Sequence, residues 1–208
     1  PADLEQNRVP TALFGCYTNA LTLFMLVPAL TQAFGVSALP NVTAAWVSGG
    51  KRRLQKSIEN VLRASVLFTL PAGLCLSVLS EPIASLLGFN PITGRILVLL
   101  GIASVFAAIS TPVCSMLQAV GRMDLPVKLM GVGLIIKPAC NWFLTSLPEV
   151  NVLGAGIGTL VCYFFLTFVG LYLLIANSGV KLRLGRVFAK PFAAAVLCAF
   201  GGFVVYQV

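Results

Sequence analysis

Lys137 and Asn141 are the residues of this sequence whose types and spacing best suit the binding of an anion. They stand four residues apart in an apolar segment, so they share one face of a helix. Lys137 lies near the middle of that segment, where a lysine costs about 2.5–3.5 kcal/mol in a bilayer. We expect Lys137 to face a polar cavity and to meet an anionic headgroup or a coupling carboxylate. Alternatively, backbone carbonyls near Pro138 satisfy Lys137, and Asn141 forms an interhelical hydrogen bond.

A stripe of small and polar residues runs along one face of the expected first helix, at 100° per residue. Its members are Gly15, Thr18, Asn19 and Thr22. Gln32 lies near the same face unless Pro28 rotates the second half of the helix. We interpret the stripe as a water-lined cavity wall, and polar contacts between helices are the alternative.

Two further motifs have simpler interpretations. Gly154 and Gly158 form a GxxxG pair, which permits two helices to approach closely. A phosphate-binding loop is excluded because no Lys-Ser or Lys-Thr follows the glycines. The run Lys51, Arg52 and Arg53 sets topology, and contact with lipid phosphate is a second role for it.

Catalytic and metal sites find little support. The sequence has no histidine, and its six acidic residues lie at or near the ends of apolar segments. No nucleophile–base pair is visible, so an enzyme is not expected. The six cysteines fall inside apolar runs without metal-ligand spacing, which indicates packing rather than disulfides. We expect no metal and no cofactor, although a coupling ion, Na⁺ or H⁺, is compatible with the sequence.

Long segments without any charge identify the membrane as the solvent of this chain. Residues 9–50, 96–121 and 150–180 contain no Asp, Glu, Lys or Arg. Charged residues make up 10% of the 208 residues, whereas soluble domains carry about 25%. The net charge of +8 comes from basic residues between apolar spans, which favours contact with lipid headgroups over nucleic acid.

These patterns predict an all-α integral membrane protein with six transmembrane helices in a single membrane domain over 1–208. Proline is expected to kink three of the helices, at Pro28, Pro71 and Pro138. The predicted helices cover about 11–46, 58–79, 93–120, 126–147, 152–177 and 187–208.

The number of lysine and arginine residues alternates between high and low in successive gaps between the predicted helices. The first, third and fifth gaps, with the helix ends beside them, hold eleven of the fourteen basic residues. Only Arg8 and Arg95 lie on the other side. The positive-inside rule therefore places the odd gaps in the cytoplasm and both ends of the chain outside. The chain begins without Met in a polar tail. A start on the outside implies at least one further span upstream if the N-terminus of the whole protein is cytoplasmic.

Several segments carry a family resemblance. They read LTLFMLVPALTQAFGVSALPNVTAAW (21–46), LFTLPAGLCLSVLSEPIASLLGF (67–89), SMLQAVGRMDLPVKLMGVGLIIKPACNWFL (115–144) and LGAGIGT (153–159). Together they resemble the second half of the multidrug/oligosaccharidyl-lipid/polysaccharide exporter superfamily, in particular its polysaccharide-flippase branch of the stage V sporulation protein B type. The prolines of these segments carry the resemblance in their order and spacing.

The resemblance implies a partial copy of a transporter with about fourteen helices in two lobes that rock to give alternating access. The chain would correspond to helices of the second lobe, and its partners would be membrane lipids, a lipid-linked glycan and the missing N-terminal lobe. The implied location is the bacterial cytoplasmic membrane. The murein-precursor branch carries an Asp-Arg pair shortly before the proline of this first helix, but Thr22 and Leu23 occupy that place here.

Three functions remain open at this point. A lipid-linked glycan flippase needs a cationic cavity for the pyrophosphate of its cargo, and Lys137 fits that need. A cation-coupled multidrug exporter of the same superfamily needs an acidic residue within the membrane, and none occurs in the interior of the expected spans. A non-transporting scaffold for envelope assembly would tolerate loss of the polar cavity residues.

Overall fold

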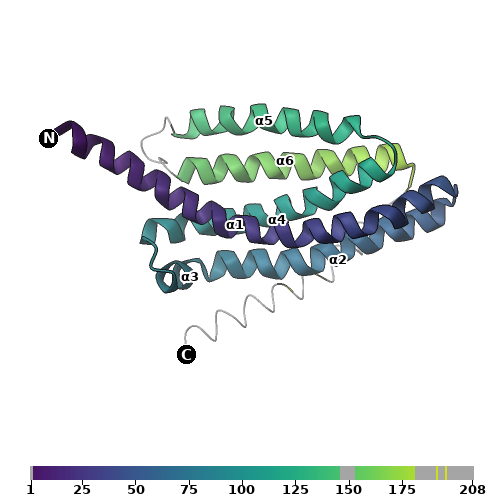
Figure 1. Cartoon of the computed structure of the whole chain (residues 1–208), viewed down its shortest axis with the longest axis horizontal. Coiled ribbons are helices and arrows are strands. Elements are labelled where there is room, and N and C mark those ends of the chain that lie inside the picture. Colours follow the sequence, from purple (N-terminus) through teal and green to yellow (C-terminus); the bar gives the residue numbers. More distant parts are fainter. Residues whose placement is uncertain (1, 146–152, 181–190, 192–194, 196–208) are drawn as a thin grey trace.

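The computed structural model describes residues 2–145, 153–180, 191 and 195, and these form a bundle of α-helices (Figure 1). No strand occurs within these ranges. The elements in chain order are α1 (Ala2–Val47), α2 (Lys51–Val78), α3 (Ser80–Leu86), α4 (Pro91–Ala119), α5 (Asp124–Thr145) and α6 (Leu153–Ser178).

Five of these helices are long and apolar enough to cross a membrane, namely all but α3. The chain is therefore an all-α membrane protein. The predicted sixth span, 187–208, lies outside the described residues apart from two isolated positions. The helices α2 and α5 continue through Pro71 and Pro138. Helix α1 also continues through Pro28, and it bends along its length (Figure 1).

Two helices begin earlier than the sequence suggests. Helix α1 starts at Ala2 rather than near Thr11, so the polar tail continues the helix. Helix α2 starts at Lys51 rather than near Ile58, directly after a turn with Gly49 at φ 67°. Lysine, arginine, glutamine and glutamate are good helix formers, so the basic segment extends the helix instead of forming a linker.

The short helix α3 was not expected from the sequence. It follows α2 after Leu79 and ends before Gly88, which adopts φ 69°. Pro82 falls in its first turn, where proline costs no hydrogen bond, and Glu81 in that turn favours a helix start. The first part of the segment between the second and third predicted spans is therefore helical.

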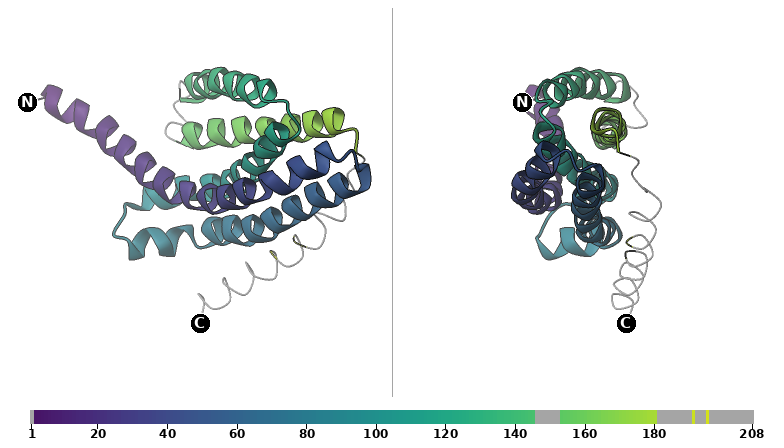
Figure 2. Two further views of the ribbon diagram at one scale, coloured as in Figure 1. Left: turned by 45° about the vertical axis from the view of Figure 1, so that its right-hand side comes forward. Right: turned by 90° about the vertical axis from the view of Figure 1, so that its right-hand side faces the viewer.

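Helix α4 lies at the centre of the bundle. It packs against α1, α2, α3 and α6, and most of its side chains are buried. Its start is fixed by Asn90, whose side-chain oxygen accepts a hydrogen bond of 3.1 Å from the Ile92 amide. Helix α5 packs mainly against α6, on the far side of the bundle from α2 (Figure 2).

The ends of the helices gather at two ends of the bundle. The α1–α2 turn, the α4–α5 turn and the C-terminal end of α6 lie together, and the α2–α3–α4 connections lie at the opposite end (Figure 1). The described basic residues between the spans, from Lys51 to Arg53 and Arg122, therefore collect at one end. This arrangement agrees with the alternation of basic residues in the sequence.

Candidate functional site

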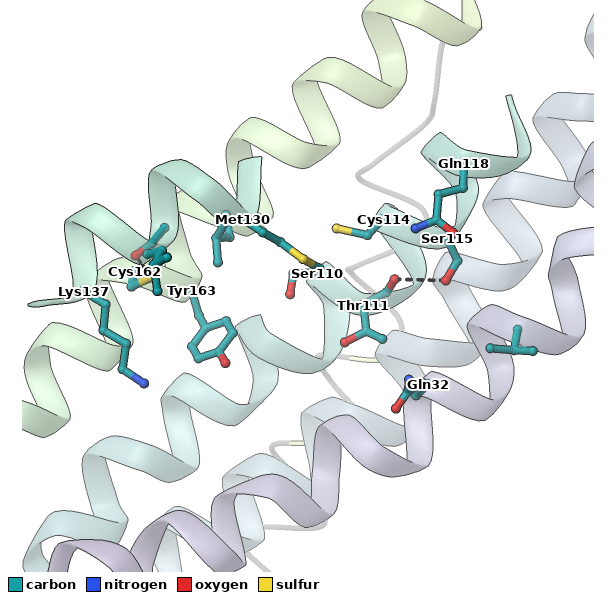
Figure 3. Close-up of a pocket in the computed structure, with 14 residues that line it drawn as sticks. Gln32, Ser110, Thr111, Cys114, Ser115, Gln118, Met130, Lys137, Cys162 and Tyr163 are labelled. Carbon is teal, nitrogen blue, oxygen red and sulfur yellow. Dashed lines mark hydrogen bonds between the residues drawn. The ribbon is translucent and has the colours of Figure 1, made fainter. Parts of the chain in front are cut away.

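A cavity of about 540 Å³ opens between α1, α4, α5 and α6 (Figure 3). Helix α4 contributes hydroxyl groups and an amide, α5 contributes a lysine, and α6 contributes a tyrosine and a thiol. The polar lining residues are Gln32, Ser110, Thr111, Cys114, Ser115, Gln118, Lys137, Cys162 and Tyr163. The remaining walls are apolar.

Lys137 is the charged side chain of this cavity. It is half-buried on α5, and it has no hydrogen-bond or ion-pair partner among the described residues. No acidic residue of the described chain lines the cavity. The cavity thus carries an uncompensated positive charge in a region that the spans place within the membrane, which suits an anion.

Three hydroxyl groups of α4 line the same cavity as this lysine. Ser110 and Thr111 both donate to the Ala107 carbonyl, at 2.7 Å and 3.1 Å. Ser115 donates to the Thr111 carbonyl at 3.3 Å. Since the hydroxyl hydrogens are used within the helix, the cavity side of α4 offers lone pairs, and the amides of Gln32 and Gln118 and the Lys137 ammonium supply the donors.

A glycine allows α5 and α6 to form their side of the cavity. A Cβ atom on Gly133 would lie 3.2 Å from Leu166 and 3.5 Å from the Cys162 sulfur. The Cys162 thiol donates to the Gly133 carbonyl at 3.5 Å. The close approach keeps Lys137, one turn further along α5, beside Tyr163 of α6 (Figure 3).

The predicted site residues fall into separate places. Gln32 and Lys137, which are far apart in sequence, line the same cavity. Asn141 does not line it, because its side-chain oxygen packs against Gly158 of α6. Gly154 packs in the same way against the backbone of Leu144. The two glycines of the GxxxG pair therefore form the crossing of α5 and α6.

The polar stripe of α1 lies away from the cavity. Thr18, Asn19 and Thr22 are exposed, and none of them lines a described pocket. The Thr18 hydroxyl donates to the Phe14 carbonyl at 2.9 Å, and the Thr22 hydroxyl donates to the Thr18 carbonyl at 3.1 Å. In the described part of the chain this stripe faces outward from the bundle.

The basic run at the start of α2 is divided among different surroundings. Lys51 lines a pocket of about 390 Å³ near Trp46 and Asn177. Arg53 lines a second pocket between α1 and α2. Arg52 lines neither of them and is exposed.

The α4 residues of the cavity were not identified from the sequence. Thr111, Ser115 and Gln118 recur at intervals of four and three residues, which is the spacing of one helix face. This polar face within a charge-free span was the signal that could have located them. The described residues contain no group of three or more His, Cys, Asp or Glu side chains that could hold a metal ion. The five described cysteines form no disulfide among the described residues.

Comparison with known proteins gives two matches. A family model described as MatE matches residues 14–143, which is more than half of the chain. The chain is also 23% identical over 167 residues to "Lipid II flippase MurJ" of Bacillus subtilis (strain 168). This alignment covers 78% of the chain and 30% of that relative, so the chain spans less than a third of the relative's length.

Proposed function

We propose, since the chain belongs to the MatE family, that it forms part of a flippase that moves lipid-linked oligosaccharide or polysaccharide precursors across the bacterial cytoplasmic membrane. The resemblance of its segments to the exporter superfamily agrees with this family membership. The observation that carries the proposal is the cavity between α1, α4, α5 and α6, in which Lys137 has no acidic partner among the described residues.

The proposed cargo explains why a lysine would stand at this depth. The pyrophosphate of a lipid-linked glycan is an anion that must leave water, and an ammonium group in the cavity stabilises it there. Gln32 and Gln118 can donate hydrogen bonds to the same oxyanion from α1 and α4. In this mechanism the described helices move as one lobe against a second lobe, and the anion is exposed to each side in turn.

The similarity to a lipid II flippase supports the transport of a lipid-linked glycan in general. The Asp-Arg pair that the sequence resemblance leads one to expect before Pro28 is absent, because Thr22 and Leu23 stand there. The proposal is therefore a lipid-linked glycan whose pyrophosphate meets Lys137, and it does not extend to lipid II itself.

A cation-coupled multidrug exporter is the alternative within the superfamily, and a scaffold for envelope assembly is the alternative outside it. A drug cation or a coupling Na⁺ or H⁺ needs an acidic group, and no acid of the described chain lines the cavity. A scaffold would not require a costly lysine within a span. Neither alternative gives the Lys137 charge a role in the export of a lipid-linked glycan.

The test uses the full-length protein that contains this chain, with complementation of glycan export as the readout and the amount of folded protein as the reference. Lys137→Met keeps the side-chain stem and removes the charge, and we expect it to abolish transport per folded molecule. Lys137→Arg should retain part of the activity, because the charge remains while the compact ammonium is lost. Wild-type transport per folded Lys137→Met molecule would refute the proposal.

A further inference from the structure

A second polar pocket lies in the groove between α1 and α2, and it shares no lining residue with the Lys137 cavity. Its volume is about 220 Å³. The polar residues that line it are Asn41 of α1 and Arg53, Ser57 and Asn60 of α2, and Val42 and Val61 complete its walls.

The spacing of the α2 residues explains why they converge. Arg53, Ser57 and Asn60 stand at intervals of four and three residues and form one face of the helix, directed at the groove. The exposed basic neighbours Arg52 and Lys56 lie on other faces and do not line the pocket. The three residues of the basic run 51–53 therefore have different surroundings in the fold. Among them, Arg53 alone lines this groove.

The polar atoms of the groove are available to a ligand. Among the described residues, none of the side chains of Asn41, Arg53, Ser57 and Asn60 has a hydrogen-bond or ion-pair partner. Some hydroxyl groups in the same helices bond to their own backbone, as Thr43 does to the Leu39 carbonyl at 2.9 Å. The Ser57 hydroxyl has no such bond, like that of the buried Ser65.

The chemistry of the groove selects an oxyanion. It combines a guanidinium group, two carboxamides and a hydroxyl group, and no carboxylate lines it. Arginine presents a planar set of donors that matches two oxygens of a phosphate group. We propose that the α1–α2 groove binds a phosphate group, with Arg53 as the bidentate donor and Asn41, Ser57 and Asn60 as neutral donors around it.

The position of the groove limits the carriers of this phosphate. Asn60 lies nine residues after Lys51, the start of α2, which is about 14 Å along the helix axis. The groove therefore begins at the basic end of the bundle and extends toward the apolar part. Its volume of about 220 Å³ accommodates a phosphorylated headgroup or a free phosphate ion.

Binding to the purified full-length protein tests the proposal, and the readout does not depend on transport. The probes are phosphatidylglycerol, diacylglycerol as the matched lipid without phosphate, and inorganic phosphate as a competitor, followed by native mass spectrometry. We expect Arg53→Gln to weaken phosphatidylglycerol binding about tenfold, and the matched control Arg52→Gln to weaken it less than about twofold. Asn60→Leu, which leaves every charge in place, should also weaken it.

Each outcome decides the matter. Displacement of phosphatidylglycerol by inorganic phosphate identifies free phosphate as a carrier of the group, and Arg53-dependent binding without displacement identifies the lipid headgroup. Equal losses in Arg52→Gln and Arg53→Gln would show general attraction to basic charge and overturn the proposal. Diacylglycerol binding as tight as phosphatidylglycerol binding would overturn it too. Should Arg53→Gln not fold, unchanged binding in Asn60→Leu overturns the proposal and weakened binding supports it.

Discussion

The hydroxyl groups of Tyr17 and Thr159 lie 3.2 Å apart and join α1 to α6. The Thr159 hydroxyl donates its hydrogen to the Ala155 carbonyl at 2.9 Å, so Tyr17 is the donor of the bond between the helices. The ring of Phe24 meets that of Tyr163 at 5.6 Å beside this bond. No Cα atoms of α1 and α6 approach within 8 Å, so these two helices are connected through side chains.

Tyr17→Phe should lower the stability of the protein without changing its packing. Hydrogen bonds between helices in membranes contribute about 0.6 kcal/mol on average and about 1.7 kcal/mol at most, so we expect a loss in that range. The matched control is Tyr172→Phe, because Tyr172 is 70% exposed on α6. Unfolding of the full-length protein in detergent measures both. A loss in Tyr172→Phe as large as that in Tyr17→Phe would contradict the role of this bond.

Gly158→Ala should destabilise the protein because the new methyl group would collide with Asn141 at the crossing of α5 and α6. Overpacking of this kind costs about 1–3 kcal/mol. Gly131→Ala is the matched control, since no atom lies within 4 Å of a Cβ at Gly131 of α5. Alanine is the better helix former, so the control should be neutral or stabilising by up to about 1 kcal/mol. In thermal unfolding we therefore expect a lower midpoint temperature for Gly158→Ala and an unchanged or higher one for Gly131→Ala.

The positions of the membrane spans were predictable from the sequence because the absence of charge over 9–50, 96–121 and 150–180 leaves few alternatives. The ends of the helices were not. Charged residues such as Lys51 and Arg53 interrupt an apolar run but form helix readily, so the loss of hydropathy marks the membrane surface and not the end of α2.

The candidate site was predictable in part. The position of Lys137 near the middle of a span marked it as a candidate cavity residue, because an ionised side chain within a membrane is energetically costly. Periodicity identified the helix faces that carry Thr22 and Asn141, but it does not show which other helix packs against each face. The structure places Asn141 at a helix crossing and Thr22 on an exposed face, while Gln32 joins Lys137 in the cavity. Which of these faces meets the cavity depends on how α4 packs between α1 and α6.

The orientation of the bundle follows from the collection of basic residues at one end. We expect single cysteines at Ser48 and Arg122 to react with impermeant reagents only from the cytoplasmic side, and one at Phe89 to react from the outside. Ser48 and Arg122 are in turns at the same end of the bundle, and Phe89 lies at the opposite end (Figure 1). Labelling of intact cells and of inverted vesicles distinguishes the two sides. Reaction at positions 48 and 89 from one side would refute the arrangement.

Gln32 and Thr22 provide the sharpest contrast between the cavity and the outer stripe of α1. Both are polar and exposed in the described bundle, but only Gln32 lines the cavity of Lys137. Gln32→Leu removes a donor for the proposed oxyanion, and we expect it to lower transport per folded molecule about tenfold, as loss of one hydrogen bond to a charged group does. Thr22→Val removes a hydroxyl that bonds to the backbone of α1, so transport should change less than about twofold.

Complementation of glycan export by the full-length variants, normalised to folded protein, measures both effects. A large loss in Thr22→Val with normal transport in Gln32→Leu would move the substrate path from the cavity to the exposed face of α1. Combination of Gln32→Leu with Lys137→Arg then tests whether the two residues act on one ligand. Residues that contact the same anion should not give additive losses, whereas independent positions should multiply their effects.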